Sequence, residues 1–167
     1  MEAAVCGVCL NSDMLCAACQ NRLDTGNVTQ KEIDVSRFLF SLSDKVRSLS
    51  NVKIVKIMDS GTLIIISKRG DAAKLVGKNG FVVKALAKEF KKSIRVLEEC
   101  DTLKNFATNL LSPVSLSGVN TLYTPEGEVY KFRIPYSFRG RMNITPENFT
   151  DIIHSMYNRK AELVFEQ

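Results

Sequence analysis

The segment that most constrains the fold of this chain is the tetrapeptide Gly77-Lys78-Asn79-Gly80, because of the elements predicted on either side of it. An apolar run over residues 62–67 predicts a strand, and residues 71–76 predict a short helix whose first residue, an Asp, is its N-cap. After the tetrapeptide, residues 81–90 predict a second helix and residues 93–97 another strand. The two glycines therefore mark a turn between two helices that two strands enclose.

The stretch Leu75-Val76-Gly77-Lys78-Asn79-Gly80 resembles the signature of the KH nucleic-acid-binding family, an aliphatic pair followed by G-K-x-G. In that family such a loop clamps the backbone of about four nucleotides. A helix N-terminus attracts phosphate, and glycines let a nucleic-acid backbone approach closely. The resemblance implies single-stranded RNA as the partner, whereas the structural alternative is a helix C-cap followed by an ordinary turn. The implied contact residues are Lys74, Leu75, Val76, Gly77, Lys78, Asn79, Gly80 and Lys84.

The residues ahead of the loop indicate the KH subtype. Thr29 and Glu32 form a capping box, and a helix begins there. Its predicted apolar face consists of Ile33, Val35, Phe38, Leu39, Leu42, Val46 and Leu49. Residues 52–58 predict a strand that turns at residues 59–61 into the next one. The resulting order, α-β-β-α-α-β, resembles the type II KH arrangement of NusA-like transcription factors and of a small-subunit ribosomal protein.

Positive charge gathers around the same loop. The chain carries a formal net charge of +5, which suits a polyanionic partner. Eight cationic residues lie near the loop or on the helix that follows it: Lys68, Arg69, Lys74, Lys78, Lys84, Lys88, Lys91 and Lys92. The alternative is that some of them form only the solvated face of that helix.

Four cysteines near the N-terminus follow the spacing C-x2-C-x6-C-x2-C. They are Cys6, Cys9, Cys16 and Cys19. Two such pairs provide the four thiolates typical of a structural zinc site, with no position left for a catalytic water. The sequence therefore predicts one structural Zn²⁺, and the alternatives are an iron–sulfur centre, a disulfide pair or free thiols.

The order of finger and KH unit resembles small archaeal zinc-bearing KH proteins that are described as NusA-like. The resemblance covers roughly residues 1–98. We therefore expect an α+β chain with a four-cysteine zinc finger at residues 1–27, a type II KH domain at 28–100, and a C-terminal α+β unit at 101–167. Residues 20–23 predict a short helix that ends the finger.

The C-terminal third predicts a helix at 101–111 and then a β-β-α-β order. The strands are expected at 114–123, 128–134 and 161–165, with a turn at 124–127. Thr145-Pro146-Glu147 begins the last helix, with a hydroxyl cap and Pro at its first position. The unit is either a degenerate second KH domain or an unrelated appendage, because Phe138-Arg139-Gly140-Arg141 stands where a G-x-x-G is expected.

Residues 130–141 interleave aromatic and cationic side chains, as proteins that bind single strands do. Tyr130, Phe132 and Ile134 alternate with cations as an amphipathic strand requires, so this half indicates a core. Beyond Pro135 the alternation ends, which leaves four candidate RNA contacts: Tyr136, Phe138, Arg139 and Arg141.

The sequence favours binding over catalysis. His154 is the only histidine, Cys100 is expected to be a small buried residue, and no paired carboxylates or Walker-type motif occur. No apolar run reaches the length of a membrane span and no signal peptide precedes the finger, so we expect a cytoplasmic protein without a membrane or small-molecule partner. We expect a NusA-like factor in transcription elongation or termination. The alternatives are a ribosome-associated or rRNA-processing factor, or an adaptor that docks on RNA polymerase or the ribosome.

Overall fold

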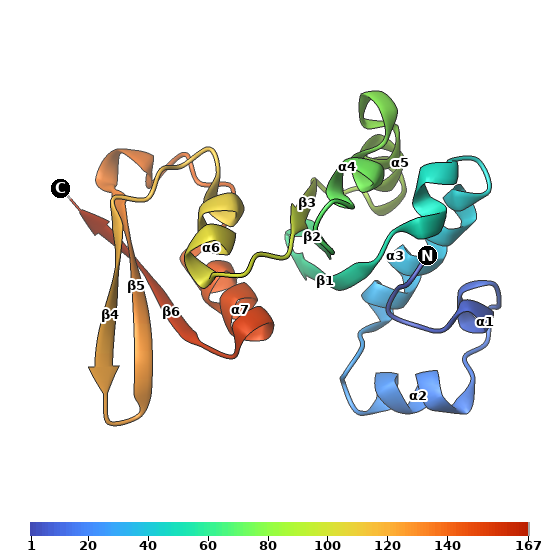
Figure 1. The fold of residues 1–167 in the computed structure, drawn as a ribbon, viewed down its shortest axis with the longest axis horizontal. Coiled ribbons are helices and arrows are strands. Elements are labelled where there is room, and N and C mark those ends of the chain that lie inside the picture. Colours follow the sequence, from blue (N-terminus) through green and yellow to red (C-terminus); the bar gives the residue numbers. More distant parts are fainter. Residues whose placement is uncertain (167) are drawn as a thin grey trace. The chain divides into compact units, whose positions relative to one another are not determined.

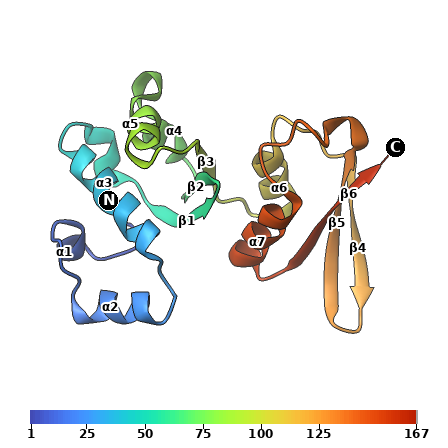
Figure 2. The same cartoon turned by 180° about the vertical axis from the view of Figure 1, so that it is seen from behind.

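The chain divides into two compact units, residues 1–99 and 100–167, in a computed structural model that describes residues 1–166 (Figure 1, and from behind in Figure 2). Each unit contains one three-stranded sheet, so the predicted α+β class is confirmed. None of the helices within residues 1–166 combines the length and the apolar character that a bilayer crossing requires.

The four-cysteine segment folds as two short helices that pack on the first long helix. They are α1 (Gly7–Leu10) and α2 (Ala17–Asp24), so the helix expected at 20–23 begins earlier, directly after Cys16. The finger has its own small core, made by Val5, Cys9, Leu10, Cys19, Val28 and Ile33. Ile33 belongs to α3, so this helix packs against the four-cysteine segment as well as against the sheet.

Helix α3 (Gln30–Ser43) starts at the predicted capping box. The Thr29 hydroxyl accepts the Glu32 backbone N–H, and the Glu32 carboxylate accepts the Thr29 backbone N–H at 2.8 Å. The predicted face was too long, because the helix ends at Ser43. Val46 lies beyond that end and Leu49 lies in the following 3₁₀ turn (Arg47–Asn51). Leu49 still reaches the same core from that turn.

The first sheet consists of β1 (Ile54–Ser60), β2 (Thr62–Ser67) and β3 (Ile94–Glu98), in that order. β1 pairs antiparallel with β2 and β3 pairs parallel with it. Helices α4 (Ala72–Val76) and α5 (Phe81–Phe90) connect β2 to β3, as the sequence predicts. The core lies between the sheet and the three helices α3, α4 and α5, and includes Leu39, Leu63, Ile65, Leu75 and Leu86.

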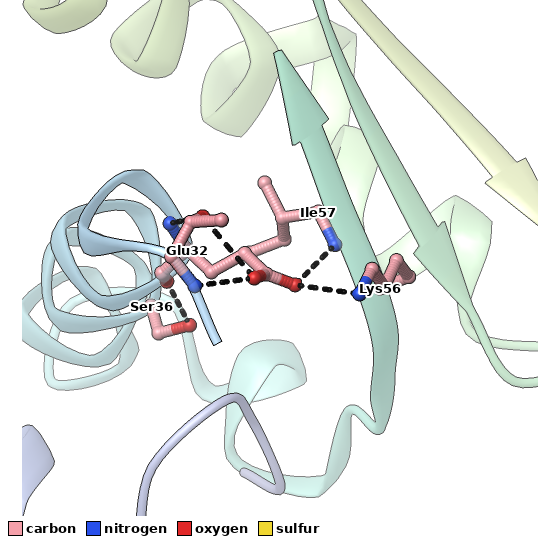
Figure 3. Close-up of polar contacts among 5 residues, drawn as sticks. Glu32, Ser36, Lys56 and Ile57 are labelled. Carbon is pink, nitrogen blue, oxygen red and sulfur yellow. Dashed lines mark hydrogen bonds and ion pairs between the residues drawn. The ribbon is translucent and has the colours of Figure 1, made fainter. Parts of the chain in front are cut away.

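Glu32 ties α3 to the outer edge of β1 (Figure 3). Its buried carboxylate accepts the Ile57 backbone N–H at 3.4 Å and lies 3.9 Å from Lys56 Nζ. A strand edge otherwise presents unpaired N–H groups, so the carboxylate satisfies a backbone donor that β2 cannot reach. The capping-box residue therefore also orients the helix against the sheet.

The second unit repeats the strand arrangement of the first. Its elements are α6 (Leu103–Leu111), β4 (Gly118–Thr124), β5 (Gly127–Pro135), α7 (Pro146–Tyr157) and β6 (Lys160–Glu166). β4 pairs antiparallel with β5, and β6 pairs parallel with β5. Both sheets thus have a hairpin followed by a parallel strand that returns through a helical connection.

The core of the second unit is aromatic. Phe132 on β5 meets Phe149 on α7 with ring centroids 5.2 Å apart, and Phe106 on α6 meets Tyr157 at 5.5 Å. Phe132 and Ile134 are buried, which confirms the amphipathic interpretation of this strand. The predicted first strand was too long, because residues 114–117 precede β4; the predicted cap and Pro at the start of α7 are confirmed.

Candidate functional site

The loop from Gly77 to Gly80 has a backbone that only particular residues adopt. Gly77, Asn79 and Gly80 have φ angles of 74°, 55° and 73°. Positive φ values are accessible to glycine at little cost, and to asparagine more readily than to other residues. The loop sequence therefore follows from its geometry, and the loop leads directly into α5.

The two glycines serve different purposes. A Cβ at Gly77 would lie 2.7 Å from Val82 Cγ2, so this position must be glycine for packing as well as for φ. A Cβ at Gly80 would meet only the Lys84 side chain, at 3.8 Å. The expectation that both glycines leave room for a ligand is therefore corrected: the Cβ side of Gly77 is filled by α5, and only Gly80 is open.

Helix α5 begins at this loop without a side-chain cap. The first N–H groups of a helix lack intrahelical partners and carry a partial positive charge, which suits an anion. Lys84 lies one turn into α5, beside Gly80. The start of α5 thus combines backbone donors with a lysine.

Seven of the eight cations near the loop, the lysines, fall into two groups. Three of those expected there are held by carboxylates: Lys68 pairs with Glu99 at 2.9 Å, Lys74 with Asp71 at 2.6 Å and Lys92 with Asp59 at 2.6 Å. Within residues 1–166, four others have no ion pair: Lys78, Lys84, Lys88 and Lys91. These four lysines are exposed and available to a partner.

Two residues expected at the surface site are structural. Leu75 is completely buried in the core of the first unit, because α4 turns it toward the sheet. Lys74 Nζ is engaged with Asp71, whose carboxylate also accepts the Lys53 backbone N–H at 2.9 Å. These bonds, the Lys74 hydrogen bond first, lower the pKa of Asp71. Leu75 therefore supports the loop from the core, and Lys74 is held in place by Asp71.

The carboxylate that caps α4 is also not the one predicted. Asp71 occupies the N-cap position but makes no capping bond, because its side chain turns to Lys53 and Lys74. Glu98, at the end of β3, instead accepts the backbone N–H groups of Gly70 and Ala72, at 3.0 and 3.2 Å. Two carboxylates thus hold α4 in place. Asp71 accepts the backbone N–H that precedes β1, and Glu98 lies at the end of β3.

Sequence reasoning missed Phe81. It is the first residue of α5 and its side chain is 51 % exposed, directly after the loop. Val76, on the other side of the loop, is exposed as well. The sequence does place an aromatic residue directly beside glycines and lysines. The apolar periodicity of α5, however, did not indicate whether Phe81 points into the core or into solvent.

The four N-terminal cysteines meet in space as their spacing predicts. Their sulfur atoms all lie within 4.8 Å of one another, close enough to hold one metal ion. The Cys6 and Cys9 sulfurs are 3.5 Å apart, and the Cys6 and Cys16 sulfurs 4.0 Å. All four are free of disulfides.

Each cysteine pair uses the same local geometry. Cys6 and Cys16 are the N-caps of α1 and α2, with ψ angles of 162° and 161°. Backbone N–H groups point at the sulfurs: those of Cys9 and Cys19 lower the pKa of Cys6 and Cys16 respectively, for Cys16 to about 7. The lowered pKa favours the thiolate of Cys6 and Cys16, the form that binds metal. At Cys9 the Cys16 backbone N–H lowers the pKa, but burial and the neighbouring thiols outweigh it and raise the pKa to about 12.

Arg37 joins the cysteine cluster to α3. Its Nε donates to the Cys9 carbonyl oxygen at 3.0 Å. The bond fixes the first knuckle on the helix that also covers the sheet. The two exposed cysteines, Cys6 and Cys16, lie on the outer side of the cluster, and the buried Cys9 and Cys19 face α3.

In the second unit, the aromatic and cationic residues after β5 pack on one another. The Arg139 guanidinium lies 5.7 Å from the ring centroids of both Tyr136 and Phe165. Tyr136 is 54 % exposed and Phe138 is half-buried, whereas Arg139 and Arg141 are exposed. A 3₁₀ turn (Tyr136–Phe138) stands here in place of a helix and glycine loop.

Comparison with known proteins gives partial matches. The chain is 33 % identical over 61 residues to a probable transcription termination protein NusA of Methanococcus vannielii, covering 36 % of this chain and 35 % of that protein. It is 29 % identical over 72 residues to the protein of the same name from Methanocaldococcus jannaschii, covering 42 % and 39 %. The chain therefore spans well under half the length of these relatives, and the matches support a NusA-like relationship.

A solved structure shares the fold. The crystal structure of APE1850 covers 83 % of this chain and 100 % of its own, with a TM-score of 0.60 and 16 % sequence identity. At that identity the likeness concerns the fold alone. No family model matches the sequence.

Proposed function

We propose that this protein binds single-stranded RNA at the Gly77–Gly80 loop of a type II KH unit and acts as a NusA-like factor in transcription elongation or termination. The partial similarity to two archaeal proteins named as probable transcription termination proteins supports this assignment. The α-β-β-α-α-β order of the first unit, with the loop between its last two helices, supports the KH identity.

The observation that carries the proposal is the left-handed turn at Asn79 and Gly80, which opens directly onto the uncapped start of α5. Such a helix start attracts phosphate. The unpaired Lys78 and Lys84 place two cations beside it, and Lys88 and Lys91 extend the positive charge along α5. Exposed Val76 and Phe81 supply apolar surface for bases on both sides of the loop.

The cysteine cluster serves as a structural zinc site in this proposal. A tetrahedral ion with metal–sulfur bonds of about 2.3 Å sets sulfur atoms about 3.8 Å apart. The Cys6–Cys9 and Cys6–Cys16 sulfur distances, 3.5 and 4.0 Å, are close to this value. Four protein thiolates leave no coordination position for substrate, so the metal supports folding rather than chemistry. In keeping with this, we propose no catalytic activity for the chain.

We assign the second unit as a degenerate KH repeat. Its strand order and directions match those of the first unit, but no glycine loop stands between β5 and α7. Without the loop the unit lacks a backbone clamp. It would therefore act as a brace or as a docking surface for protein.

The direct test is to replace Lys78 and Asn79 together by Asp in the full chain. Asp adopts left-handed conformations nearly as readily as Asn, so the turn is retained while negative charge enters the clamp. RNA affinity for a single-stranded oligonucleotide, measured by fluorescence anisotropy at physiological salt, is expected to fall at least tenfold.

The chain offers a matched control. Lys104 and Asn105 are the same residue pair, exposed at the start of α6 in the second unit. Replacing both by Asp makes the same charge change away from the loop, and RNA affinity should fall much less. Equal losses of RNA affinity in the two variants would show that the loss comes from the change in net charge and not from the loop. An unchanged affinity in the first variant would contradict the proposal.

A further inference from the structure

The two sheets have four edge strands, and three of them are protected from pairing with another chain. The outer edge of β1 is occupied by the chain itself: the Glu2 N–H donates to the Val52 carbonyl oxygen and the Ile54 N–H to the Glu2 carbonyl oxygen, both at 2.9 Å. Farther along the same edge, Glu32 accepts the Ile57 N–H. These contacts satisfy groups that would otherwise be open to a foreign strand.

The outer strands β3 and β6 are protected by charge. β3 carries Arg95 and Glu98. β6 carries Lys160, Glu162 and Glu166, which pair with carboxylates and cations of the adjoining hairpin. Charged side chains on an edge strand oppose pairing with another strand, because pairing would desolvate them.

β4 has neither protection. It reads Gly118-Val119-Asn120-Thr121-Leu122-Tyr123-Thr124, with no charge and no proline, and no charged residue occurs between Lys104 and Glu126. Within residues 1–166 its strand pairing is to β5 alone. The side chains of residues 120–123 are exposed, with Leu122 at 47 % and Tyr123 at 77 %. A long uncharged edge is a template for strand addition.

We propose that β4 is a self-association edge, on which a second copy of this chain pairs antiparallel through its own β4. The proposal is independent of RNA binding. A pair related by a two-fold axis at Thr121 sets Thr121 against Thr121 of the second copy, Asn120 against Leu122, and Val119 against Tyr123. No like charges meet in this register, and an aromatic side chain faces a β-branched one, a favourable cross-strand pair.

A second copy suits this edge because an isologous contact must be self-complementary. β1, β3 and β6 would each bring like charges or an already paired edge into such a contact, whereas β4 opposes only uncharged residues. The pairing joins two three-stranded sheets into one. A single pair of strands buries less surface than a standard stable interface, so we expect a weak, reversible dimer.

The test is sedimentation velocity of the full chain over a range of concentrations up to millimolar. The wild type is expected to shift from monomer to dimer as the concentration rises. Thr121→Lys sets two lysines opposite each other at the two-fold axis and should weaken the dimer at least tenfold. Thr121→Val, which keeps the position uncharged and β-branched, should dimerise like the wild type.

A mixture of two variants tests the register. Thr121→Glu alone should be monomeric for the same reason as Thr121→Lys, but an equimolar mixture of the two should dimerise again, because unlike charges then meet at the axis. Unchanged far-ultraviolet circular dichroism and thermal midpoints show that the variants fold. A wild type that stays monomeric at every concentration, a dimer insensitive to Thr121→Lys, or a failure of the mixture to restore it would each overturn the proposal. The proposal would also be overturned if β4 paired only with a strand of a different protein and never with a second copy of this chain.

Discussion

The two units use one strand arrangement in two ways, and the difference lies in what connects the second strand to the third. In the first unit, α4, a left-handed glycine turn and α5 fill this connection. In the second, a 3₁₀ turn, a loop and α7 fill it, and Arg139 in this connection lies against two aromatic rings of the same unit. The strand arrangement therefore does not determine whether a glycine loop is present, because that loop depends on a few residues with special backbone angles.

The units also differ in how they are held together. The first has an aliphatic core, and carboxylates and cysteines supplement it: Glu32, Asp71 and Glu98 fasten helices to strands, and the four-cysteine segment packs on α3. The second has an aromatic core and ion pairs across its strands, such as Arg133 with Glu166 at 3.0 Å. Metal and pH should accordingly affect the first unit more than the second.

Replacing cysteines of the four-cysteine cluster should produce the largest difference in stability between the two units. Replacing the buried Cys9 and Cys19 by Ser removes half of the ligand set, and metal binding by such sites contributes on the order of 10 kcal/mol to folding. We expect residues 1–27 to lose amide protection in hydrogen exchange, while the second unit keeps its protection. Purified wild-type protein should contain one zinc per chain by elemental analysis.

Cys100→Ser is the control, since this cysteine lies outside the cluster. It should leave metal content and exchange unchanged. Because Ile33 and Arg37 of α3 contact the finger, partial loss of protection in this helix is expected. Loss of protection throughout β1–β3 would show that the finger is part of the same cooperative unit as the sheet.

Replacing one glycine by alanine in each of the two connections should show that only the first connection requires glycine for its stability. Gly77→Ala introduces a Cβ at positive φ and 2.7 Å from Val82 Cγ2, so it should destabilise the first unit by about 2–3 kcal/mol. Gly140 has open space and no positive φ, so Gly140→Ala should change stability by less than about 0.5 kcal/mol. Urea denaturation measures both, and equal effects would contradict the distinction.

Asp71→Asn should cost about 1–2 kcal/mol, because it weakens the bonds to the Lys53 N–H and to Lys74 Nζ. The folded state lowers the pKa of Asp71, so its contribution is present above the ordinary aspartate pKa and is lost as the pH falls through the lower folded value. The difference in unfolding free energy between wild type and variant should therefore shrink on acidification. Asp151→Asn, which makes the same substitution at an exposed position on α7, is the control and should change the unfolding free energy by less than about 0.5 kcal/mol.

The smallest effect is expected from the aromatic residues of the second connection. Tyr136→Ala with Phe138→Ala should change RNA affinity by less than about threefold, because the Tyr136 ring already contacts Arg139 and Phe138 is half-buried. Phe81→Ala, in the first unit, should weaken binding by about fivefold or more if a base stacks there. The same anisotropy titration compares them. A tenfold loss in the double variant would instead give the second unit an RNA surface of its own.

Much of the fold follows from local patterns. The bounds of β2 and α5, the capping box at Thr29 and Glu32, and the start of α7 are as predicted, because caps, apolar periodicity and turn residues act within a few positions. The cysteine cluster also follows from spacing, because two short pairs can converge on one ion with little constraint from the rest of the chain. Helix ends were wrongly predicted where buried residues continue beyond the helix. Leu49, for example, lies in the 3₁₀ turn after α3 but packs in the same core.

The sequence by itself determined most of the helices and strands, the glycine loop and the cysteine cluster, all of which depend on residues close together along the chain. Only the tertiary structure decided which candidates are free. It buried Leu75, paired Lys74 with Asp71, gave the cap of α4 to Glu98, turned Ile33 toward the finger and exposed Phe81. It also left β4 as the one unprotected edge among the described strands. These outcomes depend on groups distant in sequence, and whether a charge or a strand edge finds a partner is decided only when those groups meet.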